Sequence, residues 1–345
     1  MNLNTAIKMI NPLDKSVMTK AKKKFDLLAK PQGSLGKLED IVIQLAGIFK
    51  NSSPKINKKI IIVMCSDNGV VNEGVTSSSQ KVTAGVANLI ADGQSSVCAL
   101  SKISGADVIA VDIGMNSSLY SKNIIKNKIA YGTNNFVNGS AMTKIQTIAA
   151  IECGIDTVRM AKEKGFNIIG TGEMGIGNTT TSSAIASVLF DLPVSEVVGR
   201  GAGLSDSGLE RKITAVKKAI NINNPQKDNP IDLLSKLGGL DIAGMTGCFI
   251  GAAAFGLPVV IDGLISSVAA YLAYMIAPES INYMIASHLT AEPAGKIILD
   301  KIQKSPLINC DMCLGEGTGC AILFSLIDHA LSAYYNTAEL KDICI

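Results

Sequence analysis

The stretch Ile60-Ile-Ile-Val-Met-Cys-Ser-Asp-Asn-Gly69 decides the fold of this 345-residue chain. An unbroken run of mostly β-branched residues passes directly into a polar turn that ends in glycine, which predicts a strand buried on both faces. The same pattern, each time followed by a helical stretch, returns at residues 108–111, 167–169, 196–198 and 258–261. Buried strands that alternate with helices predict an α/β fold, with a mostly parallel sheet and helices on both faces.

Polar residues follow each of these predicted strands. In parallel sheets, ligands bind beyond the carboxyl ends of the strands. The sequence therefore places several charged side chains near one edge of the sheet, and they are Asp67, Asp112, Glu173, Arg200 and Asp262.

The composition excludes several classes of protein. Lys plus Arg number 32 and Asp plus Glu number 29, a balance that indicates no nucleic-acid partner. The most apolar runs, 247–261 and 263–277, are each about 15 residues long, short of the ~20 that span a bilayer. They predict buried helices on either side of a buried strand, so no membrane association is expected. The first residues lack a basic-then-apolar secretory pattern, which favours a cytoplasmic location.

The eight cysteines include one C-x-x-C pair, Cys310 and Cys313. A second such pair and a neighbouring histidine are both missing from the sequence, so no metal site is predicted. The remaining thiols are expected to be reduced and mainly buried in the core. The role of Cys310 and Cys313 stays open.

Gly170-Thr-Gly-Glu-Met-Gly175 matches the dinucleotide-binding fingerprint, which makes an NAD-dependent oxidoreductase the alternative function. Two details oppose it. The next predicted strand ends in Gly199-Arg-Gly201, without the acid that would bind a ribose hydroxyl. Glu173 would also lie inside the turn that binds the pyrophosphate, where a carboxylate repels its ligand.

The same loop is better suited to a single phosphate. Its glycines, amide and hydroxyls stand at a predicted helix start, where backbone N–H groups and the helix dipole favour an anion. A second glycine loop, Gly199-Arg-Gly-Ala-Gly203, is followed by Lys212 on the next helix. Together they indicate a nucleoside monophosphate, although either loop alone could be a tight strand-to-helix turn.

Glu316 stands in the glycine turn Gly315-Glu-Gly-Thr-Gly319, ahead of an apolar helix. Glycine loses much entropy on folding, so such a turn has little value for stability. A general base that reaches into a cleft is the functional interpretation, and an acid at a helix start is the structural one. The chain has only two histidines, of which His329 lies on an apolar helix and is expected to be structural.

Seven blocks, in order along nearly the whole chain, resemble the nicotinate-nucleotide–dimethylbenzimidazole phosphoribosyltransferase family. They are Lys30-Pro-Gln-Gly-Ser-Leu-Gly-Lys-Leu-Glu39, Ser66-Asp-Asn-Gly-Val70 with Glu73-Gly-Val75, Gly172-Glu-Met-Gly-Ile-Gly-Asn-Thr-Thr180, Gly199-Arg-Gly-Ala-Gly203, Gly244-Met-Thr-Gly247, Ser287-His-Leu-Thr-Ala-Glu292 and Gly315-Glu-Gly-Thr-Gly319. The resemblance implies transfer of phosphoribose from nicotinate mononucleotide to 5,6-dimethylbenzimidazole, in cobalamin biosynthesis. No metal is expected, because no pyrophosphate leaves in this reaction, and no cofactor is predicted.

The resemblance also implies an architecture. It implies a homodimer whose subunits combine a Rossmann-like sheet domain, residues 56–304, with a small helical domain made from residues 1–55 and 305–345. It assigns Glu316 as the base and puts Glu173 close to the nicotinate and ribose. The residues it implies for binding phosphate and nucleotide are Gly175, Ile176, Gly177, Asn178, Thr179, Thr180, Gly201, Ala202, Gly203 and Lys212. Those implied for the acceptor base are Ser78, Met174 and Leu314.

Two positions depart from the family pattern. Asn68 stands where many members have histidine, so this position is not expected to carry essential chemistry. Val86 stands where some members have a glutamine that assists base binding. The acceptor is therefore open between dimethylbenzimidazole, another benzimidazole, a purine and a phenol.

Overall fold

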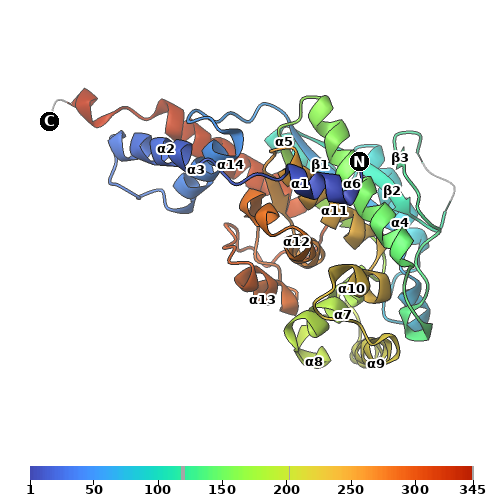
Figure 1. The fold of residues 1–345 in the computed structure, drawn as a ribbon. Coiled ribbons are helices and arrows are strands. Elements are labelled where there is room, and N and C mark those ends of the chain that lie inside the picture. Colours follow the sequence, from blue (N-terminus) through green and yellow to red (C-terminus); the bar gives the residue numbers. More distant parts are fainter. Residues whose placement is uncertain (118–120, 202, 344–345) are drawn as a thin grey trace.

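Six parallel strands form one sheet in this computed structural model, which describes residues 1–117, 121–201 and 203–343. The strands are β1 (Lys59–Ser66), β2 (Ala106–Gly114), β3 (Ile125–Lys126), β4 (Ile168–Met174), β5 (Val259–Ile261) and β6 (Met284–Ala286). Their order is β3-β2-β1-β4-β5-β6, and helices cover both faces (Figure 1). The predicted α/β fold is confirmed.

The strand order reverses beside β1. In the sheet, β1 pairs with β2 on one side and with β4 on the other, so that Lys59 lies between Ala106 and Ile168. The chain builds outward from β1 to β3 and then resumes at β4 in the opposite direction. Open α/β sheets bind their ligands at such a reversal, beyond the carboxyl ends of the strands.

One face of the sheet is covered by long apolar helices. They are α6 (Lys144–Glu163), α11 (Leu240–Ala254) and α12 (Leu264–Ile276), with the short α1 (Leu3–Met9) against α6 and α11. Every residue of α11 is buried, and β5 lies between α11 and α12 in the chain. The prediction of buried helices flanking a buried strand is confirmed. None of the described helices combines the length and the apolarity that a membrane span requires.

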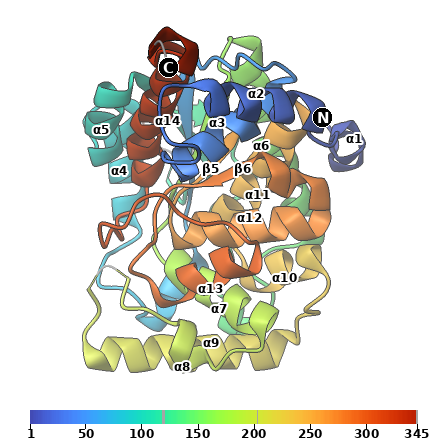
Figure 2. The same cartoon turned by 90° about the vertical axis from the view of Figure 1, so that its left-hand side faces the viewer.

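The other face carries helices from both ends of the chain. These are α2 (Lys15–Leu27), α3 (Lys37–Phe49), α4 (Lys81–Ala91), α5 (Ser96–Ser104) and α14 (Thr318–Asn336). Figures 1 and 2 show α14 beside α2 and α3, and the rings of Phe25 and Tyr334 lie 4.7 Å apart. The helices of both termini share one hydrophobic cluster with the sheet. The division into residues 1–55 with 305–345 and residues 56–304 stays a prediction.

The remaining helices lie mainly beyond the carboxyl edge of the sheet, below it in Figure 1. They are α7 (Asn178–Phe190), α8 (Val194–Val197), α9 (Asp206–Asn223), α10 (Pro230–Leu237) and α13 (Pro293–Lys301). Among the described residues, four short 3-10 helices complete the connections, and they are Gly69–Glu73, Phe136–Asn138, Pro278–Tyr283 and Leu340–Ile343.

The predicted strand at 196–198 is wrong, because these residues belong largely to helix α8. Val194 and Val197 are both buried, and a spacing of three puts them on one face of a helical turn. The Ser183 hydroxyl donates a hydrogen bond of 3.0 Å to the Val197 carbonyl and fixes this turn against α7. The pattern also missed β3 and β6, which are only two and three residues long.

The glycine fingerprint at 170–175 does not form a dinucleotide turn. Gly170 and Gly172 lie inside β4, which continues as far as Met174. A Cβ atom on Gly172 would lie 2.6 Å from the carbonyl oxygen of Glu316. Glycine is needed there because the turn that carries Glu316 crosses directly over the strand. The interpretation of 170–175 as an NAD-binding loop is therefore wrong.

Candidate active site

A cavity of about 460 Å3 opens beyond the carboxyl ends of β4 and β5. Most of the residues predicted for the site line it, and they are Glu173, Met174, Gly175, Ile176, Gly177, Asn178, Thr179, Gly201, Lys212, Leu314 and Glu316. Thr180, Gly203 and Ser78 are not among the lining residues, although Ser77, next to Ser78, is. Ala202 lies outside the described residues.

One end of the cavity is suited to an anion. Helix α7 begins there after Gly177, and its first turn has no side-chain cap from the described residues. The buried Lys212 ammonium donates to the Thr179 hydroxyl (2.9 Å) and to the Gly199 carbonyl (3.0 Å). Burial lowers the pKa of Lys212 to about 8, while Glu292 opposes the change. A free helix N-terminus beside a buried lysine is a strong site for a phosphate.

Carboxyl groups gather at the other end. Glu173, at the end of β4, is 7% exposed, and burial, with Asp241 as the next cause, raises its pKa to about 8. Asp262 follows β5, and burial raises its pKa to about 7 although the backbone N–H groups of Gly319 and Gly317 oppose the change. In the ligand-free protein at pH 7, Glu173 therefore mostly retains its proton.

Glu316 offers an acceptor that the protein leaves unused. Its backbone is left-handed, with φ at 60°, and its side chain lines the cavity. Burial raises the pKa of its carboxyl group, and the Val97 backbone N–H partly offsets this. The Oε2 atom is buried and accepts no hydrogen bond from the described residues. A buried acceptor without a donor is costly, so this atom is suited to an N–H group of a ligand.

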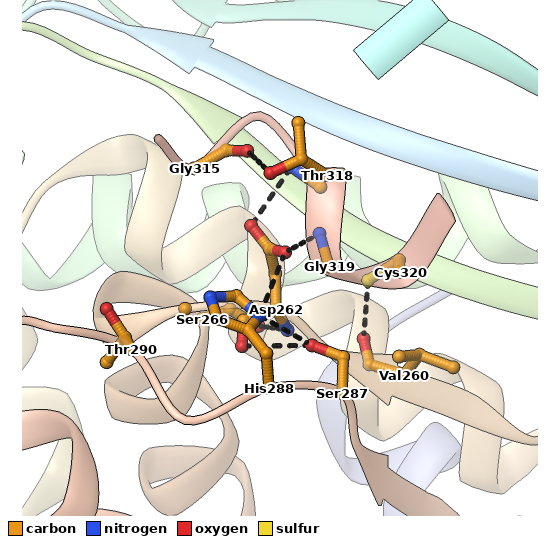
Figure 3. A network of polar contacts seen from close by, with 12 residues as sticks. Val260, Asp262, Ser266, Ser287, His288, Thr290, Gly315, Thr318, Gly319 and Cys320 are labelled. Carbon is orange, nitrogen blue, oxygen red and sulfur yellow. Dashed lines mark hydrogen bonds and ion pairs between the residues drawn. The ribbon is translucent and has the colours of Figure 1, made fainter. Parts of the chain in front are cut away.

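Asp262 fixes the turn on which Glu316 stands. Its carboxylate accepts hydrogen bonds from the backbone N–H groups of Gly317 (3.0 Å) and Gly319 (2.8 Å), at the start of α14 (Figure 3). The His288 ring lies beside it, with Nδ1 3.9 Å from the nearer carboxylate oxygen. Burial lowers the pKa of His288, which favours the neutral ring. Strand β5 and helix α14 thus hold the turn from two sides.

The other charged residues predicted at this edge divide into two groups. Arg200 lines the cavity and pairs with Asp206. Asp67 and Asp112 are buried at the ends of β1 and β2, but neither lines the cavity. Asp67 accepts a hydrogen bond from the Asn116 backbone N–H, and Asp112 forms an ion pair with Lys128.

Sequence reasoning missed Asp241 and gave no role to Glu292. Asp241 is fully buried in the first turn of α11, and its carboxylate accepts a hydrogen bond of 3.0 Å from the Asn178 amide. An acid two residues after Gly238-Gly239 was the available signal, but acids are common in first turns of helices. Glu292 lines the cavity beside Gly199.

The cysteines behave partly as expected. Cys65, Cys98, Cys248 and Cys320 are buried, and Cys153 is half-buried. Cys310 and Cys313 are exposed, and Cys313 lines the cavity. No group of three or more metal-ligating side chains occurs within residues 1–117, 121–201 and 203–343.

The reversed strand order, the cavity end suited to an anion and the unfilled carboxylate are typical of α/β enzymes that act on phosphorylated substrates. Comparison with known proteins narrows the class. A family model described as Phosphoribosyltransferase matches residues 10–344. The chain is 48% identical to nicotinate-nucleotide–dimethylbenzimidazole phosphoribosyltransferase from Clostridium acetobutylicum, over 99% of this chain and 97% of the relative.

Two further relatives agree. The enzyme of the same name from Ruminiclostridium cellulolyticum is 50% identical over the same shares of the two chains. The crystal structure of the enzyme from Thermus thermophilus superimposes with a TM-score of 0.90 at 30% identity, covering 96% of this chain and 99% of that one. The chain belongs to the nicotinate-nucleotide–dimethylbenzimidazole phosphoribosyltransferase family and is a pentosyltransferase. The alternative of an NAD-dependent oxidoreductase finds no support.

Proposed function

We propose that this enzyme transfers the phosphoribosyl group of nicotinate mononucleotide to 5,6-dimethylbenzimidazole or a related lower-ligand base. The products are α-ribazole 5′-phosphate and nicotinate, in the nucleotide-loop assembly of cobalamin biosynthesis. The names of the relatives support the donor and the acceptor.

The observation that carries the proposal is that one cavity joins a buried ammonium group at a free helix start to a group of three carboxyl groups. Lys212 and the start of α7 suit the 5′-phosphate of the donor. Glu173, Asp262 and Glu316 line the same cavity. A carboxylate near the glycosidic carbon would stabilise the positive charge that develops there when the bond to nicotinate breaks.

The leaving group needs no acid catalyst. Nicotinate departs from a pyridinium, so its ring nitrogen takes the electron pair of the broken bond and becomes neutral. The remaining requirement is a base, because an attacking azole must lose its N–H proton. This reasoning assigns one general base and no general acid.

Glu316 is the base in this proposal. The azole nitrogen forms a bond to the ribosyl carbon on the face opposite nicotinate, and the N–H proton passes to Glu316 Oε2. This single displacement inverts a β-glycoside to an α-glycoside. Two features support the assignment: the unfilled buried oxygen of Glu316 and its raised pKa, which makes the carboxylate a better base.

Glu173 has a different part. Its carboxyl group holds a proton in the ligand-free protein, so it can donate a hydrogen bond to an oxygen of the nucleotide. Met174, Ile176 and Leu314 offer apolar surface to the acceptor ring. Val86, half-buried on α4, leaves the choice among benzimidazoles, purines and phenols to experiment.

The test is incubation of the enzyme with nicotinate mononucleotide and a panel of benzimidazoles, purines and phenols. We expect nicotinate release together with one new glycoside, identified by mass, and an α-configuration by NMR. Absence of product with every acceptor, or a β-glycoside, would refute the proposed reaction.

The base is tested with Glu316→Gln and with Glu339→Gln, an acid outside the cavity, as the matched control. We expect the first variant to fold normally and to lose about 100- to 10,000-fold in kcat, and the control to retain its rate. A near-normal rate for Glu316→Gln at neutral pH would remove the base assignment.

The proposal also includes a homodimer that works in the cytoplasm. Light scattering on the purified enzyme is expected to give twice the chain mass, and fractionation of cells is expected to recover the enzyme in the cytoplasmic fraction.

A further inference from the structure

A row of three side chains runs from beneath the cavity to its surface. The Asn178 amide nitrogen donates to Asp241 Oδ2 at 3.0 Å and, through its other hydrogen, to Glu173 Oε2. All three side chains are buried, at 0%, 5% and 7% exposure for Asp241, Asn178 and Glu173. Glu173 and Asn178 line the cavity, whereas Asp241 does not. Asp241 therefore acts on a ligand only through its neighbours.

The direction of the Asn178 amide decides what Glu173 can do. The NH2 end of a side-chain amide offers two donors and the carbonyl end offers an acceptor, whereas an ionised carboxylate can only accept. Because Asp241 requires a donor, the NH2 group of Asn178 faces both carboxyl groups. Glu173 Oε2 is thereby occupied as an acceptor, so a proton on Glu173 sits on Oε1. That atom lies against Gly315, in the turn that carries Glu316.

We propose that Asp241 is a positioning residue for the transfer reaction, which turns the Asn178 amide toward Glu173 and so holds Glu173 Oε1 ready to donate to the nucleotide. The inference rests on the proposed function and extends it to a residue outside the cavity. A buried carboxylate beneath a ligand-binding loop is costly to fold, which indicates that it serves this purpose.

The charges around Glu173 come from four elements. Among these charges, Asp241 on α11 raises the pKa of Glu173 most, followed by Asp262 after β5 and Glu316 before α14. The buried Cys65 thiol, on β1, also interacts with Glu173. Burial raises the pKa of Asp241 to about 6, and hydrogen bonds from the Asn178 amide and the Ile242 backbone N–H oppose the change. At pH 7 Asp241 is thus mostly ionised while Glu173 is mostly protonated. Removal of the Asp241 charge lowers the pKa of Glu173, because the Asp241 charge raises this pKa more than the Asn178 hydrogen bond lowers it.

The test compares kcat against pH for the wild type and Asp241→Asn with nicotinate mononucleotide and dimethylbenzimidazole. The pH dependence of kcat reports the substrate complex, in which the phosphate keeps Lys212 charged. We expect the alkaline limb, assigned to Glu173, to move down by at least about one pH unit, and the acid limb, assigned to Glu316, to stay. At pH 8, kcat is expected to fall about fivefold or more, while KM for the mononucleotide changes less than about threefold.

The Glu173→Gln background separates positioning from general damage. Glutamine carries a permanent donor, so we expect no alkaline limb there, and Asp241→Asn is expected to move nothing further. Asp112→Asn removes a buried carboxylate from a neighbouring strand end without touching Asn178, and it is expected to leave the alkaline limb unchanged.

Each failure has a distinct signature. If the wild type makes no glycoside, the proposed function is wrong. If the wild type is active but Asp241→Asn has an unshifted alkaline limb, or shifts it equally in the Glu173→Gln background, the inference is wrong. If Asp241→Asn does not fold, the Asn178→Ala variant provides the test. It keeps the Asp241 charge and removes the hydrogen-bond donor to Glu173, so the alkaline limb must move to higher pH. An unmoved alkaline limb overturns the inference.

Discussion

Lys212→Met removes the one buried ammonium that lines the phosphate end of the cavity among the described residues. We expect it to weaken binding of nicotinate mononucleotide and to change little for nicotinate riboside, which has no phosphate. A hydrogen bond to a charged group contributes about 1.5 to 3 kcal/mol. At 1.36 kcal/mol for each factor of ten, the dissociation constant of the mononucleotide is expected to rise about 10- to 150-fold.

The stability of the ligand-free enzyme should change in the opposite direction. The fall in the pKa of Lys212 from 10.5 to about 8 corresponds to about 3 kcal/mol of destabilisation at pH 7. Methionine avoids this cost but forfeits two hydrogen bonds, each contributing about 1 kcal/mol. We therefore expect Lys212→Met to unfold with a free energy about 1 to 2 kcal/mol higher at pH 7.

The pH dependence follows with a definite sign. Between pH 8 and 10.5 the unfolded wild type binds more protons at Lys212 than the folded form, so its stability rises with pH and the advantage of Lys212→Met shrinks. Mononucleotide binding by the wild type weakens above about pH 8, because the free lysine loses its charge.

The assays are calorimetric titration with both substrates, initial rates, and urea unfolding at pH 7 and pH 10. Lys218→Met, an exposed lysine on the same helix, is the matched control. Equal losses for the mononucleotide and the riboside would refute the phosphate role of Lys212, and lower stability of Lys212→Met at pH 7 would refute the burial argument.

Three further outcomes are expected. Gly319→Ala places a methyl group against His288 and Ser287 and displaces the turn beside Asp262. Steady-state rates should show a kcat loss of about 100-fold or more, while the circular dichroism spectrum stays unchanged. Normal turnover would contradict this prediction. The pKa of Glu173 rises from 4.5 to about 8 on folding, so between these pH values the folded wild type binds more protons than the unfolded chain. The free energy of unfolding of the wild type should therefore fall relative to that of Glu173→Gln as the pH rises from 4.5 to 8. Parallel curves for the two proteins in urea titrations would argue against this. Alkylation of exposed Cys313 with N-ethylmaleimide should inhibit the enzyme and be slowed by bound mononucleotide, and retained inhibition in Cys313→Ser would exclude that thiol.

Local sequence predicted the strands that are long or strongly apolar. Ile60-Ile-Ile-Val-Met64 was sufficient for β1, because a continuous β-branched run has few alternatives to a doubly buried strand. At 196–198 the same composition forms the helix α8, since three residues cannot distinguish a period of two from a helical turn. The strand β6 was missed because Met284-Ile-Ala286 lacks the run of β-branched residues that marks the equally short β5.

The glycines show a second limit. The spacing at 170–175 matched a dinucleotide turn, but Gly172 within it is required because the distant turn that carries Glu316 packs on β4. Only the folded chain brings the Glu316 turn to that strand. Close packing between segments that are distant in the sequence leaves no local sequence pattern, so the glycine spacing was interpreted as a ligand-binding loop.

The sequence by itself determined the fold class, and it pointed to the loop at the start of α7 and to Glu316, both of which line the cavity. Each of these depends on a contiguous pattern of residues. The tertiary structure decided how the acids work together. Asp241 on α11, Asp262 after β5 and Glu316 before α14 all raise the pKa of Glu173, and together with burial they keep a proton on it. Electrostatic coupling depends on distance in space and on exclusion of water, and neither can be read from positions along a chain.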